Sequence, residues 1–390
     1  MTASTLSPAA ALISLPAPIA RTAAPAARAA TPAAAPGSTD QPRLRRRFRG
    51  TDLKIAARLA AAALDRDRPI VTHLVVTRRC NLSCGYCFEY DKVSPPVPRE
   101  VLEARIDHLA KLRSVFVTLT GGESLLHPDI VELVRYVRAR GMIPLVNTNG
   151  YLLTREIVEG LNDAGLYGLQ LSIDNAVPNE VSKKSLKPLR PKLRLLARYA
   201  RFRVRINTVL GSSQPEQALE VARACTAYGF ETNCSLVREE SGALAAPTAR
   251  TREVYQEIRA LGRRLPRYMD DDYTQTLLDQ GTIDWKCRAG ARTFMICENG
   301  LVHLCQPRMG SPGTPLLEYT VEDIRRAFDA PKPCAATCPI AFAHHASRLD
   351  GWRAQRGQPL LAAGPAAAPE LPALPPIAAH ARRSSLLVVR

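Results

Sequence analysis

Short apolar runs rich in β-branched residues alternate with helix-length segments between residues 71 and 237. The runs predict strands at Val71–Thr77, Ser114–Thr120, Met142–Asn147, Gly168–Asp174, Phe202–Leu210 and Glu231–Val237. The segments between them predict helices near 98–112, 128–140, 154–164, 188–201 and 215–228. This rhythm is typical of parallel βαβ units. Six units are fewer than the eight of a closed barrel, so we expect an α/β fold with a partial (β/α)6 TIM-like barrel.

The 390 residues allow more than one domain, and composition changes along the chain indicate the boundaries. The predicted parts are a disordered Ala/Pro/Arg-rich segment at 1–50, the barrel core at 51–245, a linker helix region at 246–282, a small cysteine-rich domain at 283–345 and a low-complexity tail at 346–390. The core should begin with an Ala-rich helix near 52–65. Both ends lack the apolar surface that would offset the entropy of ordering them.

The net charge of +17 is concentrated at the two ends of the chain. Residues 1–70 hold 11 Lys or Arg against 4 Asp or Glu, and residues 346–390 hold 6 against 2. This distribution favours solvated basic tails over a binding surface for nucleic acid or anionic lipid. No run of 18 apolar residues and no signal-peptide pattern occurs, and five of the ten cysteines lie in short C-x3-C-x2-C and C-x3-C groups that suit metal ligation better than disulfides. We therefore expect a cytoplasmic protein that does not enter a membrane.

Three cysteines follow the first predicted strand with the spacing C-x3-C-x2-C, at Cys80, Cys84 and Cys87. Chemistry in barrel folds is placed in loops at the carboxyl ends of strands. A closed zinc site needs four ligands, and a [4Fe–4S] cluster has four irons to hold. Three thiolates would leave one iron open to a ligand. The alternatives are structural thiols or a zinc knuckle, which would need a fourth ligand; the nearby His73 lies on the strand before the motif.

Polar residues also end the next predicted strands. They are Gly121, Gly122 and Glu123 after the second strand, Asn147 and Asn149 after the third, Ser172 and Asp174 at the fourth, and Asn207 on the fifth. Three of these motifs have a simpler explanation: a β-turn for Gly-Gly-Glu and for Asn-Gly, and a helix cap for Asp174. Cys234, on the sixth strand, is a candidate hydrogen-atom donor inside the barrel, whereas Cys225 is expected to be a buried apolar residue.

A second group of cysteines lies in residues 283–345. Met295–Glu298 and Leu301–Leu304 flank Asn-Gly and predict a β-hairpin. Cys287 and Cys305 bracket this hairpin, and Cys334 and Cys338 follow at C-x3-C spacing. Four thiolates can enclose one further [4Fe–4S] cluster, or form a zinc ribbon. Cys297, just before the turn, is not expected to be a ligand.

Together these motifs resemble the radical S-adenosylmethionine (radical SAM) superfamily, with an auxiliary domain of the SPASM or shorter twitch type. The resemblance implies that Cys80, Cys84 and Cys87 hold a [4Fe–4S] cluster whose open iron binds S-adenosylmethionine. It further implies cofactor contacts from Gly121, Gly122, Glu123, Asn147, Asn149, Ser172, Asp174 and Asn207, and an auxiliary [4Fe–4S] cluster on Cys287, Cys305, Cys334 and Cys338. Reductive cleavage of S-adenosylmethionine would yield a 5′-deoxyadenosyl radical that abstracts a hydrogen atom from a substrate.

The resemblance favours a peptide or protein as the substrate, with a small-molecule dehydrogenase or other small-molecule modifier as the alternative. A reductant such as flavodoxin or ferredoxin is the implied partner. A non-catalytic zinc or nucleic-acid-binding protein is the competing class. It leaves Glu123, Ser172 and Asp174 at successive strand ends unexplained.

Overall fold

The computed structural model of the protein describes residues 50–87, 90–237, 244, 247–261, 272–309 and 312–353. All of these described residues belong to one compact unit. The disorder predicted for 1–50 falls outside the described residues except at Gly50, and the tail beyond residue 353 also lies outside them.

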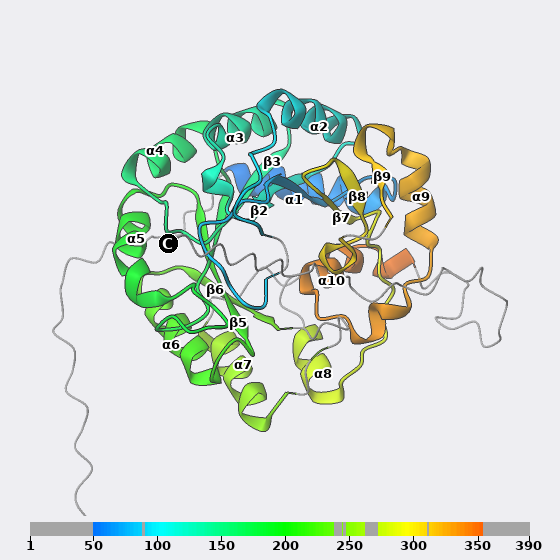
Figure 1. Ribbon diagram of the computed structural model, residues 1–390. Coiled ribbons are helices and arrows are strands. Elements are labelled where there is room, and N and C mark those ends of the chain that lie inside the picture. Colours follow the sequence, from blue (N-terminus) through cyan, green and yellow to red (C-terminus); the bar gives the residue numbers. More distant parts are fainter. Residues whose placement is uncertain are drawn as a thin grey trace, which may run out of the picture. The chain divides into compact units, whose positions relative to one another are not determined.

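The six predicted strands are present and form the parallel part of one sheet (Figure 1). Their bounds are β1 Val71–Thr77, β2 Phe116–Gly121, β3 Ile143–Thr148, β4 Gly168–Ser172, β5 Arg203–Leu210 and β6 Glu231–Leu236. They pair in the order β6-β5-β4-β3-β2-β1, and each pair is parallel. The strand β4 ends two residues earlier than predicted, so Asp174 lies in the loop that follows it.

The helices α2 to α6 alternate with the strands and, with α7 after β6, surround the sheet, whereas α1 precedes β1 and packs near the starts of the strands (Figure 1). Their bounds are α1 Gly50–Leu64, α2 Arg99–Lys111, α3 Ile130–Ala139, α4 Arg155–Ala164, α5 Leu186–Tyr199, α6 Pro215–Ala227, α7 Ala249–Leu261 and α8 Tyr273–Gln280. A short 3-10 helix, η1, spans Ser124–Leu126. The amphipathic pattern explains this arrangement, because the buried side chains of α3, such as Leu133 and Val137, join the core of the sheet.

Alternation along the strands separates two faces of the sheet. Leu74, Val117, Leu169 and Ile206 belong to the apolar core shared with the helices. Their neighbours along each strand therefore point to the concave side of the sheet. Among the described residues, the strand β6 pairs with β5 alone and forms one edge of the sheet, so the barrel does not close within this part of the chain. This confirms the predicted partial barrel.

The cysteine-rich region extends the barrel sheet. The strand β7 (Thr293–Ile296) pairs parallel to β1, and β8 (Leu301–His303) and β9 (Thr314–Pro315) continue the sheet antiparallel. The predicted hairpin is confirmed, with its first strand two residues earlier than expected. The remaining elements are α9 Val321–Asp329, α10 Ala341–Arg348, η2 Gln306–Arg308, η3 Leu316–Glu318, η4 Pro333–Thr337 and η5 Gly351–Arg353.

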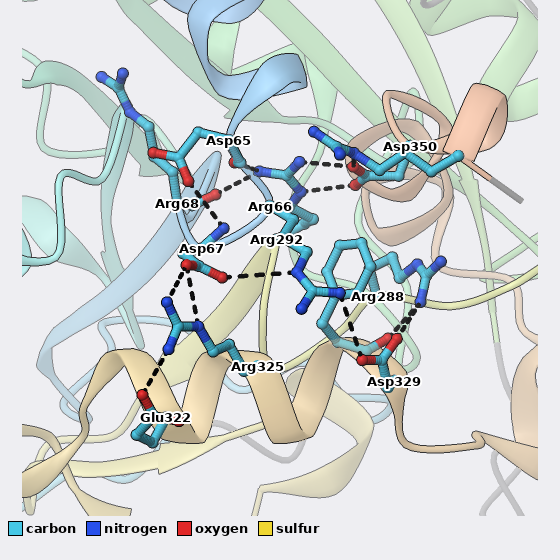
Figure 2. A network of polar contacts seen from close by, with 12 residues as sticks. Asp65, Arg66, Asp67, Arg68, Arg288, Arg292, Glu322, Arg325, Asp329 and Asp350 are labelled. Carbon is cyan, nitrogen blue, oxygen red and sulfur yellow. Dashed lines mark hydrogen bonds and ion pairs between the residues drawn. The ribbon is translucent and has the colours of Figure 1, made fainter.

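A buried ion pair fastens the end of the described chain to the barrel (Figure 2). The Arg292 guanidinium donates to both carboxylate oxygens of Asp350 at 2.6 Å, and both side chains are almost fully buried. Arg292 also donates to the backbone oxygens of Asp65 and Arg68, at 2.7 Å each, ahead of β1. The first residues of the predicted tail 346–390 therefore belong to the folded part: Ala346, Ser347 and Asp350 are buried, and Arg353 donates to the backbone oxygen of Ala63.

Candidate functional site

The three cysteines of the C-x3-C-x2-C motif lie in one loop, described at residues 78–87 and 90–91, which we call the cysteine loop. It leaves the carboxyl end of β1 as predicted. Its two ends are joined by backbone hydrogen bonds, from Cys80 to Asp91 at 3.0 Å and from Asp91 to Arg78 at 2.9 Å. Lys92 donates to the carbonyl oxygens of Cys80 and Leu82. The cysteines themselves are half-buried at Cys80 and Cys87 and buried at Cys84.

Hydrogen-bond donors surround two of these sulfur atoms. The Leu82 N–H points to the Cys80 sulfur at 3.4 Å, and the Lys183 N–H points to the Cys84 sulfur at 3.4 Å. The Asn149 amide nitrogen lies 3.8 Å from the Cys80 sulfur. Such donors stabilise thiolates and tune iron–sulfur clusters. Burial raises the pKa of the Cys80 thiol, and a cation bound beside the sulfur would favour its thiolate.

The Gly121–Gly122 pair explains how the end of β2 meets the cysteine loop. A Cβ atom on Gly122 would lie 2.3 Å from the carbonyl oxygen of Arg78, and one on Gly121 would lie 2.1 Å from that of Thr77. The Gly122 N–H donates to Thr77, and the Glu123 N–H donates to Arg79, at 2.9 Å each. The glycines thus permit close approach to the chain's own backbone, whereas we had expected approach to a ligand.

Glu123 joins the second and third strand ends. It is 1% exposed, and its carboxylate accepts from the backbone N–H of Leu125 at 3.0 Å and of Asn149 at 2.7 Å. The Thr148 hydroxyl donates to it at 2.5 Å. Burial raises the pKa of Glu123, and these three donors act against that rise. Asn149 in turn donates to the Asn81 side chain at 2.7 Å, so Glu123 and the cysteine loop are connected.

Asp174 is fully buried in the loop after β4. One carboxylate oxygen, Oδ2, accepts from the Tyr86 hydroxyl at 2.7 Å and the Ser182 hydroxyl at 2.5 Å, and lies 3.3 Å from the Lys184 ammonium. The other, Oδ1, is buried and has no hydrogen-bond partner among the described residues. A buried acceptor without a donor is costly, so a ligand hydroxyl or ammonium would fit there.

Tyr86, Ser182 and Lys184 were not predicted as site residues. Burial alone would lower the pKa of Lys184, but the negative charge of Asp174 raises it above its ordinary value. The Gly85 N–H donates to Val181 at 2.8 Å, so the segment 175–185 is held directly against the cysteine loop. Of these three residues, Tyr86 could have been noticed in the sequence, because it lies inside the C-x3-C-x2-C motif. Ser182 and Lys184 lie in no recognised motif.

Ser172 and Asn207 share one row of the concave face. They are register partners on β4 and β5, and Asn207 pairs in turn with Asn233 on β6. The Asn207 side-chain oxygen accepts from Asn233 at 3.2 Å and from the Ser235 hydroxyl at 2.9 Å. Asn233 and Ser235 were missed, although their alternation with Cys234 marks them as facing the same side.

The structure places the remaining two barrel candidates differently. Asn147, which precedes Thr148 on β3, donates from its side-chain amide to the Thr120 hydroxyl on β2 at 3.5 Å. Cys234 does not point into the barrel, which corrects our suggestion that it donates a hydrogen atom there. It packs with α6 and α7, in a cluster with Leu219 and Val254. Burial raises its pKa to about 12, as expected for an apolar packing residue.

Three of the four auxiliary cysteines gather beside the hairpin. Cys287 and Cys305 belong to one small cluster with Ala335, which follows Cys334 in η4. Burial raises the pKa of Cys287, and the neighbouring Cys334 adds to that rise. The Cys338 sulfur accepts from the Ile340 N–H at 3.4 Å. In neither cysteine region do the described side chains form a group of three or more metal-binding residues close enough to hold an ion.

Comparison with known proteins gives one family. Residues 74–241 match the profile of the Radical SAM superfamily. Among curated relatives, Fe-coproporphyrin III synthase of Methanosarcina barkeri is 33% identical over 124 residues, 31% of this chain and 31% of its own. GTP 3′,8-cyclase of Chlorobaculum tepidum is 42% identical over 105 residues (26% and 32%), and PqqA peptide cyclase of Bradyrhizobium diazoefficiens is 34% identical over 107 (27% and 28%). The matched stretch spans about a third of these relatives' lengths.

Solved structures extend the likeness of the fold beyond the barrel. The crystal structure of SuiB from Streptococcus suis has a TM-score of 0.53 at 17% identity, covering 72% of this chain and 71% of that one. SuiB bound to its precursor peptide SuiA gives 0.51 at 16% identity, covering 72% and 70%. None of the described helices is long and apolar enough to span a membrane.

Proposed function

Because residues 74–241 of this chain belong to the radical SAM superfamily, we propose that the protein is an enzyme that cleaves S-adenosylmethionine at a [4Fe–4S] cluster held by Cys80, Cys84 and Cys87. A reduced cluster there would supply the electron that splits the sulfonium bond and yields the 5′-deoxyadenosyl radical for hydrogen abstraction. The observation that carries the proposal is the convergence of the cysteine loop, Glu123, Asn149 and Asp174 at one edge of the sheet.

The chain's own residues would bind and orient the two groups. Backbone N–H groups of Leu82 and Lys183 would stabilise the cluster sulfurs. The Asp174 oxygen Oδ1 would accept from a ribose hydroxyl or ammonium of S-adenosylmethionine, since it has no partner among the described residues. Ser172 and Asn207 would line the concave face beside it. The buried walls around Asp174 would exclude water from the reacting atoms.

We propose a peptide or protein as the substrate. PqqA peptide cyclase is among the sequence relatives, and SuiB, which shares the fold, has been crystallised with a precursor peptide. The second candidate is a small molecule, which the relatives named GTP 3′,8-cyclase and Fe-coproporphyrin III synthase favour. Incubating the reconstituted enzyme with S-adenosylmethionine and each substrate class, with mass spectrometry of the products, distinguishes the two.

The activity is tested by anaerobic reconstitution, reduction with dithionite and measurement of 5′-deoxyadenosine. Cys84→Ala should abolish the nucleoside, because one of three cluster ligands is lost. Cys225→Ala is the matched control: this cysteine is buried in the helix-side core, and its loss should leave the product within about twofold. Full activity of Cys84→Ala would refute the assigned ligands.

An auxiliary cluster is the second part of the proposal, with Cys287, Cys305, Cys334 and Cys338 as its ligands. The reconstituted protein should then contain about eight irons per chain, four in each cluster. Cys287→Ala should lower the count to about four and leave the cluster at Cys80 in place, as seen in its spectrum with S-adenosylmethionine. About four irons in the unaltered protein, or zinc in their place, would refute the second cluster.

A further inference from the structure

The solvent-facing side of α5 carries a row of cationic side chains. Lys187, Arg190, Arg194 and Arg198 are all exposed, and their spacing of three or four residues places them on one face of the helix. The leucines that α5 buries lie on the opposite face. We call the four cations the basic face of α5. It extends about 16 Å along the helix axis, at about 1.5 Å per residue.

The charge of the basic face is not neutralised by neighbouring carboxylates. The helix α5 itself contains no Asp or Glu. Within the part of the chain that the structure describes, Lys187, Arg190 and Arg194 form no ion pair, and Arg198 lies over the Tyr199 ring at 5.3 Å. Like charges three or four residues apart on a helix repel one another. An anionic ligand along this face would relieve that repulsion.

The basic face begins beside the candidate site. The Leu186 and Lys187 N–H groups, in the first turn of α5, donate to the carbonyl oxygens of Asn175 at 2.8 Å and Ala176 at 3.1 Å, the two residues that follow Asp174. From there α5 returns along the outside of the sheet to the start of β5, which pairs parallel with β4. The basic face therefore runs from the edge of the sheet that holds the cysteine loop toward the opposite edge.

The neighbouring helices limit the width of a ligand that this face can hold. The helices α4 and α6 flank α5 (Figure 1). Each carries an exposed carboxylate, Glu156 on α4 and Glu220 on α6. A broad polyanion, such as duplex nucleic acid or an anionic membrane, would lie across several helices and meet these carboxylates. A single extended peptide would lie along α5 alone, and about five residues at about 3.3 Å each would cover the basic face.

We propose that the basic face of α5 binds an acidic stretch of about five residues in the peptide or protein substrate, away from the residue that is modified. This inference rests on the proposed peptide substrate. The acidic stretch would hold the substrate at the edge of the sheet while another part of it reaches the concave face. Since the charges on both sides are exposed, the attraction acts mainly on the rate of encounter and is weakened by salt.

The test measures binding of a labelled peptide with about five successive glutamates to the reconstituted full-length protein, by fluorescence anisotropy at low salt. The same peptide with glutamine in place of glutamate is the uncharged probe. In Arg190→Glu/Arg194→Glu, which reverses two central charges, we expect the affinity for the glutamate peptide to fall about tenfold. The variant Arg190→Lys/Arg194→Lys keeps both charges and should bind within about threefold of the wild type.

The matched control reverses the same amount of charge on other helices. Lys54 on α1 and Lys111 at the end of α2 are both exposed, and Lys54→Glu/Lys111→Glu should leave the affinity for the glutamate peptide within about twofold. An equal loss in this control, an unchanged affinity in Arg190→Glu/Arg194→Glu, or equal binding of the two peptides by the wild type would each overturn the proposal. So would a single-stranded oligonucleotide or phosphatidylserine vesicles that bind more tightly than the peptide and depend on the same two arginines.

Formation of 5′-deoxyadenosine with dithionite and no added peptide separates this proposal from the proposed function. In Arg190→Glu/Arg194→Glu its rate should stay within about twofold of the wild type, because the basic face lies outside the site. A rate that falls as much as the peptide affinity would contradict a role confined to docking. A wild type that forms no 5′-deoxyadenosine would instead refute the proposed function, while peptide binding could still be measured.

Discussion

At the residue scale, the site depends on buried polar groups that sequence motifs mark only in part. Glu123 and Asp174 are both buried carboxylates, yet their surroundings differ. Glu123 accepts from two backbone N–H groups and the Thr148 hydroxyl, and so holds two strand ends together. In Asp174, the oxygen Oδ2 accepts two hydrogen bonds, from Tyr86 and Ser182, whereas Oδ1 has no partner among the described residues. We infer that Glu123 is mainly structural before cofactor binds, whereas Asp174 is prepared for a ligand.

His73 provides a pH-dependent prediction. Its ring is tilted by 49° against that of Phe342, with 4.6 Å between the ring centroids, and burial lowers the pKa of His73 to about 4. Between pH 6.5 and 4 the unfolded chain therefore binds more protons, and stability falls as the pH falls through this window. The total loss is roughly 3 kcal/mol. In denaturant titrations His73→Leu should remove this part of the acid sensitivity and leave the profile above pH 6.5 parallel to the wild type. An unchanged acid slope would contradict the assignment.

At the element scale, the residues at strand ends could be predicted where they form a short sequence motif. The loop residues that contact them could not. The cysteine spacing, Gly121–Glu123 and Asn147–Gly150 each carry a local signal, and the parallel order of β1, β2 and β3 brings them to one edge. The segment 175–185 has no periodic pattern, so nothing in the sequence indicated that Ser182 and Lys184 would contact Asp174. The face of Cys234 was misassigned because its orientation depends on packing against α6 and α7.

Gly122→Ala tests the close contact between two of these elements. The new Cβ would meet backbone oxygens of Arg78 and Arg79 at 2.3 and 2.5 Å, which cannot rotate away as a side chain would. We expect a loss of about 1–3 kcal/mol in the free energy of unfolding and reduced iron loading, because the cysteine loop must shift. Gly351→Ala is the control without a clash, since nothing lies within 4 Å of the Cβ position at Gly351; it should retain normal iron content. Normal loading in Gly122→Ala would argue against the contact.

At the scale of the whole molecule, the cysteine-rich region and the barrel are one continuous sheet. The hairpin was predicted from Asn299–Gly300, but its pairing with β1 was not. Pairing between strands about 220 residues apart is set by packing and leaves no local pattern. The burial of Asp350 likewise leaves no local pattern in the sequence. This residue is 1% exposed, although the segment from residue 346 has the low-complexity composition expected of a tail.

Asp350→Asn tests the fastening of that segment. It would leave the buried Arg292 charge without its carboxylate, and breaking such a pair costs about 3–5 kcal/mol. Calorimetry or denaturant titration should show this loss. Arg325→Ala is the control, because Arg325 pairs with Asp67 at 2.7 Å but is 45% exposed, and exposed pairs contribute about 1 kcal/mol or less. Equal effects of the two substitutions would contradict the structural distinction.

The central claim is that three cysteines leave one cluster iron free for S-adenosylmethionine. The most direct test is electron–nuclear double resonance on the reduced, reconstituted protein with S-adenosylmethionine labelled with ¹⁵N at its amino group. A hyperfine coupling between the label and the cluster, lost in Cys84→Ala, is the result predicted here. A four-iron cluster that forms at Cys80, Cys84 and Cys87 but shows no coupling to the bound, labelled cofactor would contradict it.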